Sequence, residues 1–227
     1  MVLRLALFLC LSLLLEACYL SHYPVTPKVA SASTYRIFNT EVSGTAWAAG
    51  PGFVVTAGHV CEKGGPFTLS DGHFNYPAEP VVWVDGPIPA LLGPYGLEDL
   101  CVLSTRAKVV PMIIAPHMPR PGDTVWYTGY PRREFGTFFG PYYGDLDGPE
   151  STMNDYASGA PCAPGASGSA MYTEAGVWGV LVRIRTDGGF IHTGPEGCVA
   201  IPLHKLLAIL NVAGVDYNLP PEMPPEM

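Results

Sequence analysis

Residues 54 to 61 read V-V-T-A-G-H-V-C, an apolar β-branched run that ends at a small Ala-Gly pair and a histidine. This run predicts a buried strand leading to His59. Similar runs recur along the chain between turn signals such as Asp71-Gly72. The predicted strands are residues 34–38, 52–56, 80–84, 100–104, 109–114, 124–128, 177–182 and 198–201. Many short strands at this spacing indicate an all-β sandwich or a pair of barrels.

The C-terminal part of the chain carries the only helical pattern that we expect in the mature protein. Within residues 202–212 the leucines recur at helical spacing, at Leu203, Leu206, Leu207 and Leu210. The chain then ends in a repeated P-P-E-M, which predicts a flexible tail over residues 213–227.

The composition limits the classes of function. Of the 227 residues, 48% are hydrophobic and only 14% are charged, which suits a packed core and not a disordered chain. The net charge is −8 and the 12 basic residues form no cluster, so nucleic acid is not an expected partner. No close Cys-x-x-Cys pair is present, so we expect no zinc site or other metal site.

The N-terminus has the features of a targeting segment. Arg4 precedes an apolar run over residues 5–15, which is too short to span a bilayer. We therefore expect a signal peptide over residues 1–17 and an exported protein, with a buried N-terminal helix as the alternative. A spacer over residues 18–33 follows, and export implies an oxidising environment in which disulfides persist.

The end of the signal peptide resembles a bacterial lipobox. Residues 15 to 18 read L-E-A-C, although Glu16 stands where a small residue is usual. The resemblance implies cleavage before Cys18, lipid on that cysteine and attachment to a membrane, with the spacer as a tether. The alternative is ordinary cleavage near Ala17, which would leave a freely secreted or periplasmic protein.

Two further motifs carry chemistry. Residues 164 to 170 read P-G-A-S-G-S-A, and a serine between glycines can sit on a tight turn with its hydroxyl exposed. The amides of Gly165 and Ser167 could then form an oxyanion hole, although an ordinary Gly/Ser turn is the alternative. Residues 98 to 103 read E-D-L-C-V-L, so Asp99 opens an apolar strand where its carboxylate can receive an imidazole N–H.

Together these motifs resemble the chymotrypsin-type (trypsin-like) serine proteases. The matches are T-A-G-H at 56–59, D-L-x-V-L at 99–103 and P-G-x-S-G-S-A at 164–170, in that family's order of His, Asp and Ser. The resemblance implies a catalytic triad of His59, Asp99 and Ser167 and no cofactor. It also implies two six-stranded antiparallel barrels, over residues 34–115 and 116–212, and a polypeptide substrate.

The bacterial branch, with the high-temperature-requirement proteases and the glutamyl endopeptidases, is the most similar part of the family. Ala166 departs from the Asn or Asp that usually precedes the nucleophile. In animal trypsins an aspartate there binds the new N-terminus after activation. Its absence argues against such an activation switch.

The family also suggests the specificity pocket and the disulfides. Its pocket stretches correspond to residues 157–163, 179–185 and 197–201, the last including Cys198. Within the second stretch, Val180, Leu181 and Val182 favour a small apolar side chain, whereas Arg183 or His192 could receive an acidic one. A disulfide joins similar regions in animal relatives, which implies Cys162–Cys198. By exclusion Cys61 would pair with Cys101, with free buried cysteines as the alternative.

Two other functions are compatible with parts of this sequence. An α/β-hydrolase would order its triad as Ser, acid and His, and Asp187 and His204 do lie downstream of Ser167. However, the second elbow glycine is missing, and too little chain follows for the rest of that fold. The other rival is a catalytically inactive binding protein on the chymotrypsin fold, but no triad member is missing.

Overall fold

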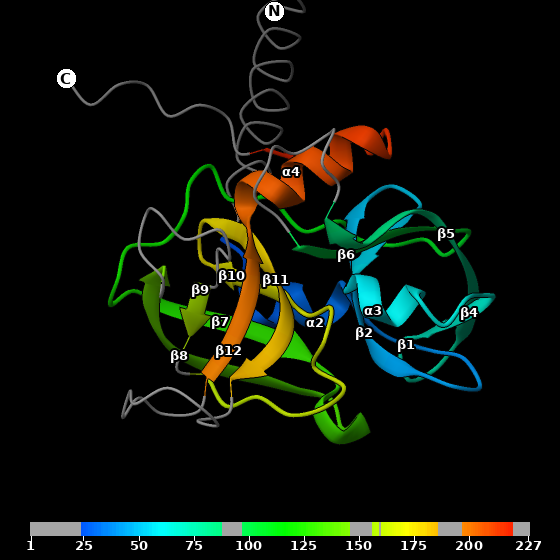
Figure 1. Cartoon of the computed structure of the whole chain (residues 1–227), viewed down its shortest axis with the longest axis horizontal. Helices are drawn as coiled ribbons and strands as arrows, with labels where there is room; N and C mark the ends of the chain where they lie inside the picture. Colours follow the sequence, from blue (N-terminus) through cyan, green and yellow to red (C-terminus); the bar gives the residue numbers. More distant parts are fainter. Residues whose placement is uncertain (1–23, 88–96, 146–155, 159, 186–196, 220–227) are drawn as a thin grey trace, which may run out of the picture.

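Two closed barrels of six strands each form the described part of the molecule (Figure 1). The computed structural model describes residues 24–87, 97–145, 156–158, 160–185 and 197–219. All strand pairs within the barrels are antiparallel. This confirms the predicted all-β double barrel and excludes the α/β-hydrolase alternative, which needs a mostly parallel sheet covered by helices.

The first barrel has the strand order β1-β2-β3-β6-β5-β4. Its strands are β1 (Thr34–Phe38), β2 (Ser43–Gly50), β3 (Phe53–Thr56), β4 (Phe67–Ser70), β5 (Asn75–Pro87) and β6 (Leu97–Thr105). The second barrel has the order β10-β11-β12-β9-β8-β7. Its strands are β7 (Thr124–Gly129), β8 (Gly136–Asp145), β9 (Tyr156–Ser158), β10 (Ala170–Thr173), β11 (Gly176–Arg185) and β12 (Gly197–Pro202).

The C-terminal helix α4 (Leu203–Val212) ties the two barrels together. Its leucines Leu203, Leu206 and Leu210 are buried, as their helical spacing predicts. The helix packs against β6 of the first barrel and against β11 and β12 of the second, and Figure 1 shows it lying across both. One hydrophobic cluster accordingly contains Val54 of the first barrel, Val180 of the second and Leu206 of α4. A smaller cluster fills the second barrel.

The structure differs from the sequence predictions in the segment that joins the barrels. Residues 109–114 were predicted as a strand, and this prediction is wrong. The amides of this segment bond to three separate places: Met112 to Ala48, Ile114 to Asn218, and neighbouring Ala115 to Val177. Pro111 has no N–H to donate, and the neighbouring amides have different partners, so the segment forms no regular ladder with one strand. The segment is a connector that both barrels hold.

The two ends of the described chain are also more ordered than expected. Within the predicted spacer, α2 (Pro27–Ala32) begins at the N-cap Thr26, and the Val25 amide donates to Glu174 of the second barrel at 3.0 Å. Within the predicted tail, Val215 is buried against the core. The sequence showed neither contact because both partners are distant along the chain. The predicted signal peptide and Cys18 lie outside the described residues.

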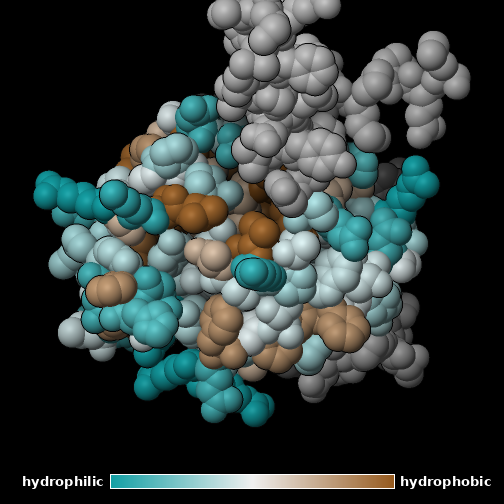
Figure 2. Space-filling model, turned by 180° about the vertical axis from the view of Figure 1, so that it is seen from behind, coloured by the Kyte–Doolittle hydropathy of each residue, from teal (hydrophilic) through white to brown (hydrophobic). Residues whose placement is uncertain are grey.

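The surface carries scattered hydrophobic side chains. Seen from behind in Figure 2, the most hydrophobic ones gather near the middle of the face, with polar side chains around them. In the part of the chain that the structure describes, no helix is long and apolar enough to cross a membrane.

Candidate active site

His59 and Asp99 meet at the end of β3. His59 is the second residue of α3 (Gly58–Cys61), which follows β3 directly. Its Nδ1 lies 2.7 Å from Oδ2 of Asp99, and its backbone N–H donates to Oδ1 of Asp99 at 2.6 Å. The Asp99 side chain is 13% exposed and that of His59 is 39% exposed. The carboxylate can therefore orient the ring from a shielded position while part of the ring stays accessible.

Gly58 explains why α3 comes so close to Asp99. A Cβ at this position would overlap the carbonyl oxygen of Val84 in β5 and would lie 2.9 Å from the amide nitrogen of Leu100 in β6. Only glycine allows the helix to lie directly on these two strands. The glycine directly before the histidine in the sequence thus has a packing cause.

Ser167 lies on a turn built by two glycines. Gly165 has φ of +95° and Gly168 has φ of +88°, values that other residues rarely adopt. Pro164 and Gly165 occupy the central positions of a turn closed by a 3.1 Å hydrogen bond from the Ala166 amide to the Ala163 carbonyl. Proline followed by glycine is the preference of a type II turn.

The backbone groups around Ser167 can be accounted for one by one. Four successive carbonyl groups, those of residues 164 to 167, each accept a hydrogen bond. Thr45 supplies two of the donors, its hydroxyl to Gly165 and its amide to Ser167. The Arg132 amide donates to Pro164, and the Ser169 amide donates to Ala166. The Gly168 amide donates to Leu181. Among the described residues, the amides of Gly165 and Ser167 find no acceptor. The turn therefore keeps two N–H groups available on either side of Ala166.

Close contacts between the barrels bring the Ser167 turn beside His59. A Cβ on Gly168 would overlap the carbonyl oxygen of Thr45 and the hydroxyl of Thr56, and it would lie 2.9 Å from the amide nitrogen of Ala57. On the other side, a Cβ on Gly44 would lie 3.0 Å from Val60 and 3.1 Å from the carbonyl oxygen of Ser167. The neighbours of His59 in sequence thus contact the neighbours of Ser167. Within the described residues, no hydrogen bond joins the Ser167 hydroxyl to the His59 ring.

Both predicted disulfides are present. Cys61 is bonded to Cys101, with their Cα atoms 6.4 Å apart, and Cys162 is bonded to Cys198, with their Cα atoms 5.6 Å apart. The first joins α3 to β6, two residues beyond His59 and two beyond Asp99. The second joins the loop before the Ser167 turn to β12.

The predicted pocket residues take different positions. Val180, Leu181 and Val182 are buried in the two hydrophobic clusters. The backbone of Leu181 supports the Ser167 turn, because its carbonyl accepts from Gly168 at 2.7 Å and its amide donates to Ser169 at 2.9 Å. Arg183 pairs with Val199 of β12. Cys198 is buried in the bridge to Cys162, and His192 lies outside the described residues.

Two tyrosines, Tyr127 and Tyr130, lie near the turn, and the first holds a loop beside it. The Tyr127 hydroxyl donates to the carbonyl of Pro161 at 2.6 Å. Burial raises the pKa of Tyr127, so this hydroxyl stays protonated and remains a donor. The pKa of Tyr130 is also raised, chiefly by burial and then by the charge of Asp71. Sequence reasoning did not single out these residues, because nothing local indicates which loops they reach.

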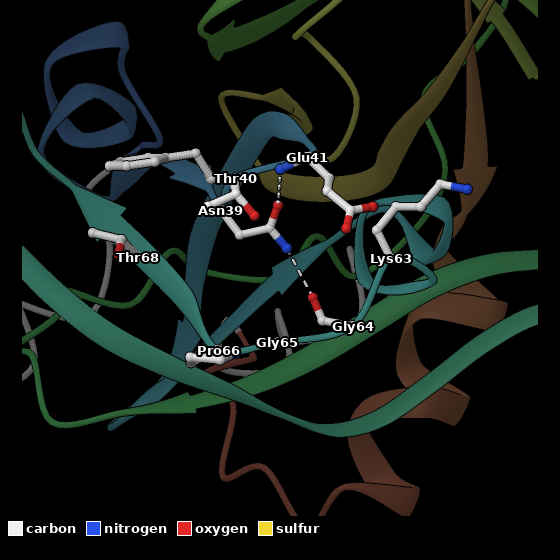
Figure 3. A pocket seen from close by; sticks show the side chains of 9 residues that line it. Asn39, Thr40, Glu41, Lys63, Gly64, Gly65, Pro66 and Thr68 are labelled. Carbon is white, nitrogen blue, oxygen red and sulfur yellow. Dashed lines mark hydrogen bonds between the residues drawn. The ribbon is translucent and has the colours of Figure 1, made fainter.

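Two surface pockets flank the site. One, of about 470 Å³, lies between the β1–β2 turn and the loop after α3 (Figure 3). There the Asn39 side chain accepts from the Glu41 amide at 2.8 Å and donates to Gly64 at 2.8 Å, which joins the two loops. The other, of about 340 Å³, borders Arg132 and Cys162. Within the described ranges, no group of three or more His, Cys, Asp or Glu side chains is placed to hold a metal ion.

Comparison with solved structures assigns the fold. The active form of the Rv3671c protease from M. tuberculosis superposes with a TM-score of 0.67 at 18% identity, covering 86% of this chain and 90% of that one. The serine endoprotease from Yersinia pestis superposes with a TM-score of 0.65 at 18% identity, covering 84% and 67%. The fold is that of the chymotrypsin-type serine proteases. No protein-family model matches the chain, and no curated protein matches it in sequence.

Proposed function

We propose that the protein is an exported serine endopeptidase in which Ser167, His59 and Asp99 form the catalytic triad. The observation that carries the proposal is the backbone arrangement at the Ser167 turn. The peptide groups around the serine are tied to their surroundings except for the amides of Gly165 and Ser167, which have no acceptor among the described residues. The His59–Asp99 pair lies beside this turn. The likeness to solved serine proteases supports the same reaction class.

In the proposed mechanism the Ser167 hydroxyl attacks the carbonyl carbon of a peptide bond. His59 accepts the hydroxyl proton and then donates it to the leaving amine, so that an acyl-enzyme remains on Ser167. Water, deprotonated by His59, then releases the acid and restores the serine. Asp99 holds the ring with Nδ1–H toward itself and stabilises the imidazolium. The amides of Gly165 and Ser167 hold the oxyanion of each tetrahedral intermediate.

The proposed substrate has a small apolar side chain before the scissile bond. The apolar character of Val180, Leu181 and Val182, in one of the three stretches expected to wall the pocket, supports this choice. The Cys162–Cys198 bridge joins the other two stretches. An acidic preference through Arg183 or His192 is the alternative. Cleavage of a peptide library by the purified enzyme distinguishes the two.

Labelling by a fluorophosphonate probe, together with peptide hydrolysis, tests the reaction. The wild type should be labelled and should hydrolyse peptides, whereas Ser167→Ala should lose labelling and on the order of 10⁶-fold in kcat. His59→Ala should lose nearly as much, because triad members act as a unit.

Ser169→Ala is the matched control. Ser169 lies two residues beyond Ser167, is fully buried, and its hydroxyl has no hydrogen-bond partner within the described structure. This variant should keep both labelling and turnover. Peptide hydrolysis that persists in purified Ser167→Ala would refute the assignment. A folded wild type that is neither labelled nor active would instead favour the inactive binding protein.

A further inference from the structure

Thr45, in the middle of the barrel interface, uses every one of its polar groups. It lies in β2 and is fully buried. Its amide donates to the Ser167 carbonyl at 2.9 Å, and its hydroxyl donates to the Gly165 carbonyl at 2.8 Å. The same hydroxyl accepts from the Tyr130 amide at 2.9 Å, and the Thr45 carbonyl accepts from the Thr56 hydroxyl at 2.6 Å. Three of these four partners belong to the second barrel.

The orientation of the Thr45 hydroxyl follows from its partners. An amide can only donate, so the Tyr130 N–H occupies a lone pair of Oγ1, and the hydroxyl proton is left for the Gly165 carbonyl. On the other side of Gly165, the Pro164 carbonyl accepts from the Arg132 amide at 2.7 Å. Because the N–H of a trans peptide points opposite to the carbonyl of the same peptide plane, the bond from Arg132 to Pro164 sets the direction of the Gly165 N–H. The Thr45 hydroxyl holds the next peptide plane, which carries the Gly165 carbonyl, so the planes on both sides of the Gly165 Cα are fixed.

The loop that supplies Tyr130 and Arg132 is held in an unfavourable conformation. Arg132 has φ of +53° and Arg133 has φ of +70°, both in the left-handed region that non-glycine residues rarely adopt. Such conformations persist only where surrounding contacts impose them. The bonds from Tyr130 to Thr45 and from Arg132 to Pro164 are two such contacts, and both end at the Ser167 turn or at the residue that holds it.

We propose that Thr45 is a positioning residue for the oxyanion hole. Its hydroxyl holds Gly165 so that the Gly165 amide converges with the Ser167 amide on the substrate oxygen. This inference rests on the proposed function. It assigns to a side chain of the first barrel the alignment of a turn that is 120 residues away in sequence.

Thr45→Val tests the role, because valine keeps the shape and removes only the hydroxyl. The Gly165 carbonyl and the Tyr130 amide would then lose their shared partner, and kcat should fall by about tenfold or more with little change in KM, since a misaligned oxyanion donor acts on the transition state. Thr45→Ser keeps the hydroxyl and should recover kcat to within about threefold of the wild type. Thr45→Ala serves if the valine variant fails to fold.

Thr128→Val is the matched control. Thr128 is equally buried, and its hydroxyl bonds to Thr137 and Tyr172, each at 2.9 Å, away from the Ser167 turn. The Thr128→Val variant loses as many hydroxyl contacts as Thr45→Val and should keep the kcat of the wild type even if its melting temperature falls. An unchanged kcat in Thr45→Val, or a loss no larger than in Thr128→Val, would overturn the proposal.

A structural readout separates this proposal from the proposed function. Crystal structures of the wild type and of Thr45→Val should differ in the direction of the Gly165 amide. If the wild type proves inactive towards peptides and fluorophosphonate, the proposed function fails, and the Gly165 amide still decides the role of Thr45: a displaced amide supports positioning, and an unmoved amide refutes it.

Discussion

Gly58 is the residue on which the approach of His59 to Asp99 depends. In Gly58→Ala the new Cβ would overlap the carbonyl oxygen of Val84, so α3 must move away from β5 and β6. We expect a loss of stability of about 1–3 kcal/mol, as for overpacking elsewhere, together with a loss of peptidase activity larger than that loss of stability explains. Urea unfolding and kcat/KM, measured on the same samples, check both parts.

Gly72→Ala provides the comparison for this residue. Unlike Gly58, Gly72 has a left-handed backbone, with φ of +91°, and a Cβ there would meet nothing within 4 Å. The Gly72→Ala variant should lose roughly 1 kcal/mol in the free energy of unfolding, from the backbone conformation alone, and should keep its activity. Equal activity in Gly58→Ala and Gly72→Ala would show that the contact with Val84 does not position His59.

At the scale of elements, the Cys61–Cys101 bridge holds α3 on β6. The two cysteines are 40 residues apart, so the bridge restricts a large part of the unfolded first barrel. The double variant Cys61→Ala/Cys101→Ala should lose about 4 kcal/mol in the free energy of unfolding, by the loop-entropy relation. Guanidinium unfolding under non-reducing conditions measures the change.

Peptide mapping without reduction is the companion measurement. It should recover a cross-linked peptide containing Cys61 and Cys101 and another containing Cys162 and Cys198. The Cys61–Cys101 bridge lies within the first barrel and the Cys162–Cys198 bridge within the second, so neither joins the two barrels covalently. Alkylation of Cys61 in the native, unreduced protein would contradict the first part of this prediction.

For the whole molecule, we predict attachment to a membrane through Cys18. Only residues 19–23 separate Cys18 from the first described residue, Pro24. The amide of the next residue, Val25, donates a hydrogen bond to the Glu174 carbonyl of the second barrel. A lipid on Cys18 would therefore hold the barrels within roughly 20 Å of the membrane, from the reach of an extended chain. The wild type should fractionate with membranes and Cys18→Ser with the soluble exported material, as shown by immunoblotting.

The soluble exported fraction is the decisive one for this prediction. Removing the acylated cysteine removes the chains that give stable anchoring, because one chain alone binds only marginally. Wild type and Cys18→Ser both found in that fraction would contradict the anchor and leave a freely secreted protein. Cys10→Ser, which changes a cysteine within the apolar run, is the control and should fractionate like the wild type.

The sequence by itself determined what depends on local pattern. Apolar runs such as 54–56 and the leucines of α4 place strands and helix, because burial of alternate or periodic side chains is encoded within a few residues. The Pro-Gly of the Ser167 turn likewise specifies its own backbone. The two disulfide pairings came from resemblance and exclusion, and the structure contains both.

Only the tertiary structure decided what depends on contacts between the barrels. The Thr45 hydroxyl reaches Gly165 across 120 residues of chain, and no local pattern distinguishes Thr45 from other threonines in strands. Residues 109–114 have the composition of a strand, yet the amides of Met112, Ile114 and neighbouring Ala115 donate to three separate segments, and residues 109–114 become a connector. The physical reason is the same in both cases: a polar backbone or hydroxyl group takes the partner that packing brings to it, and packing of two barrels is settled only when both have formed.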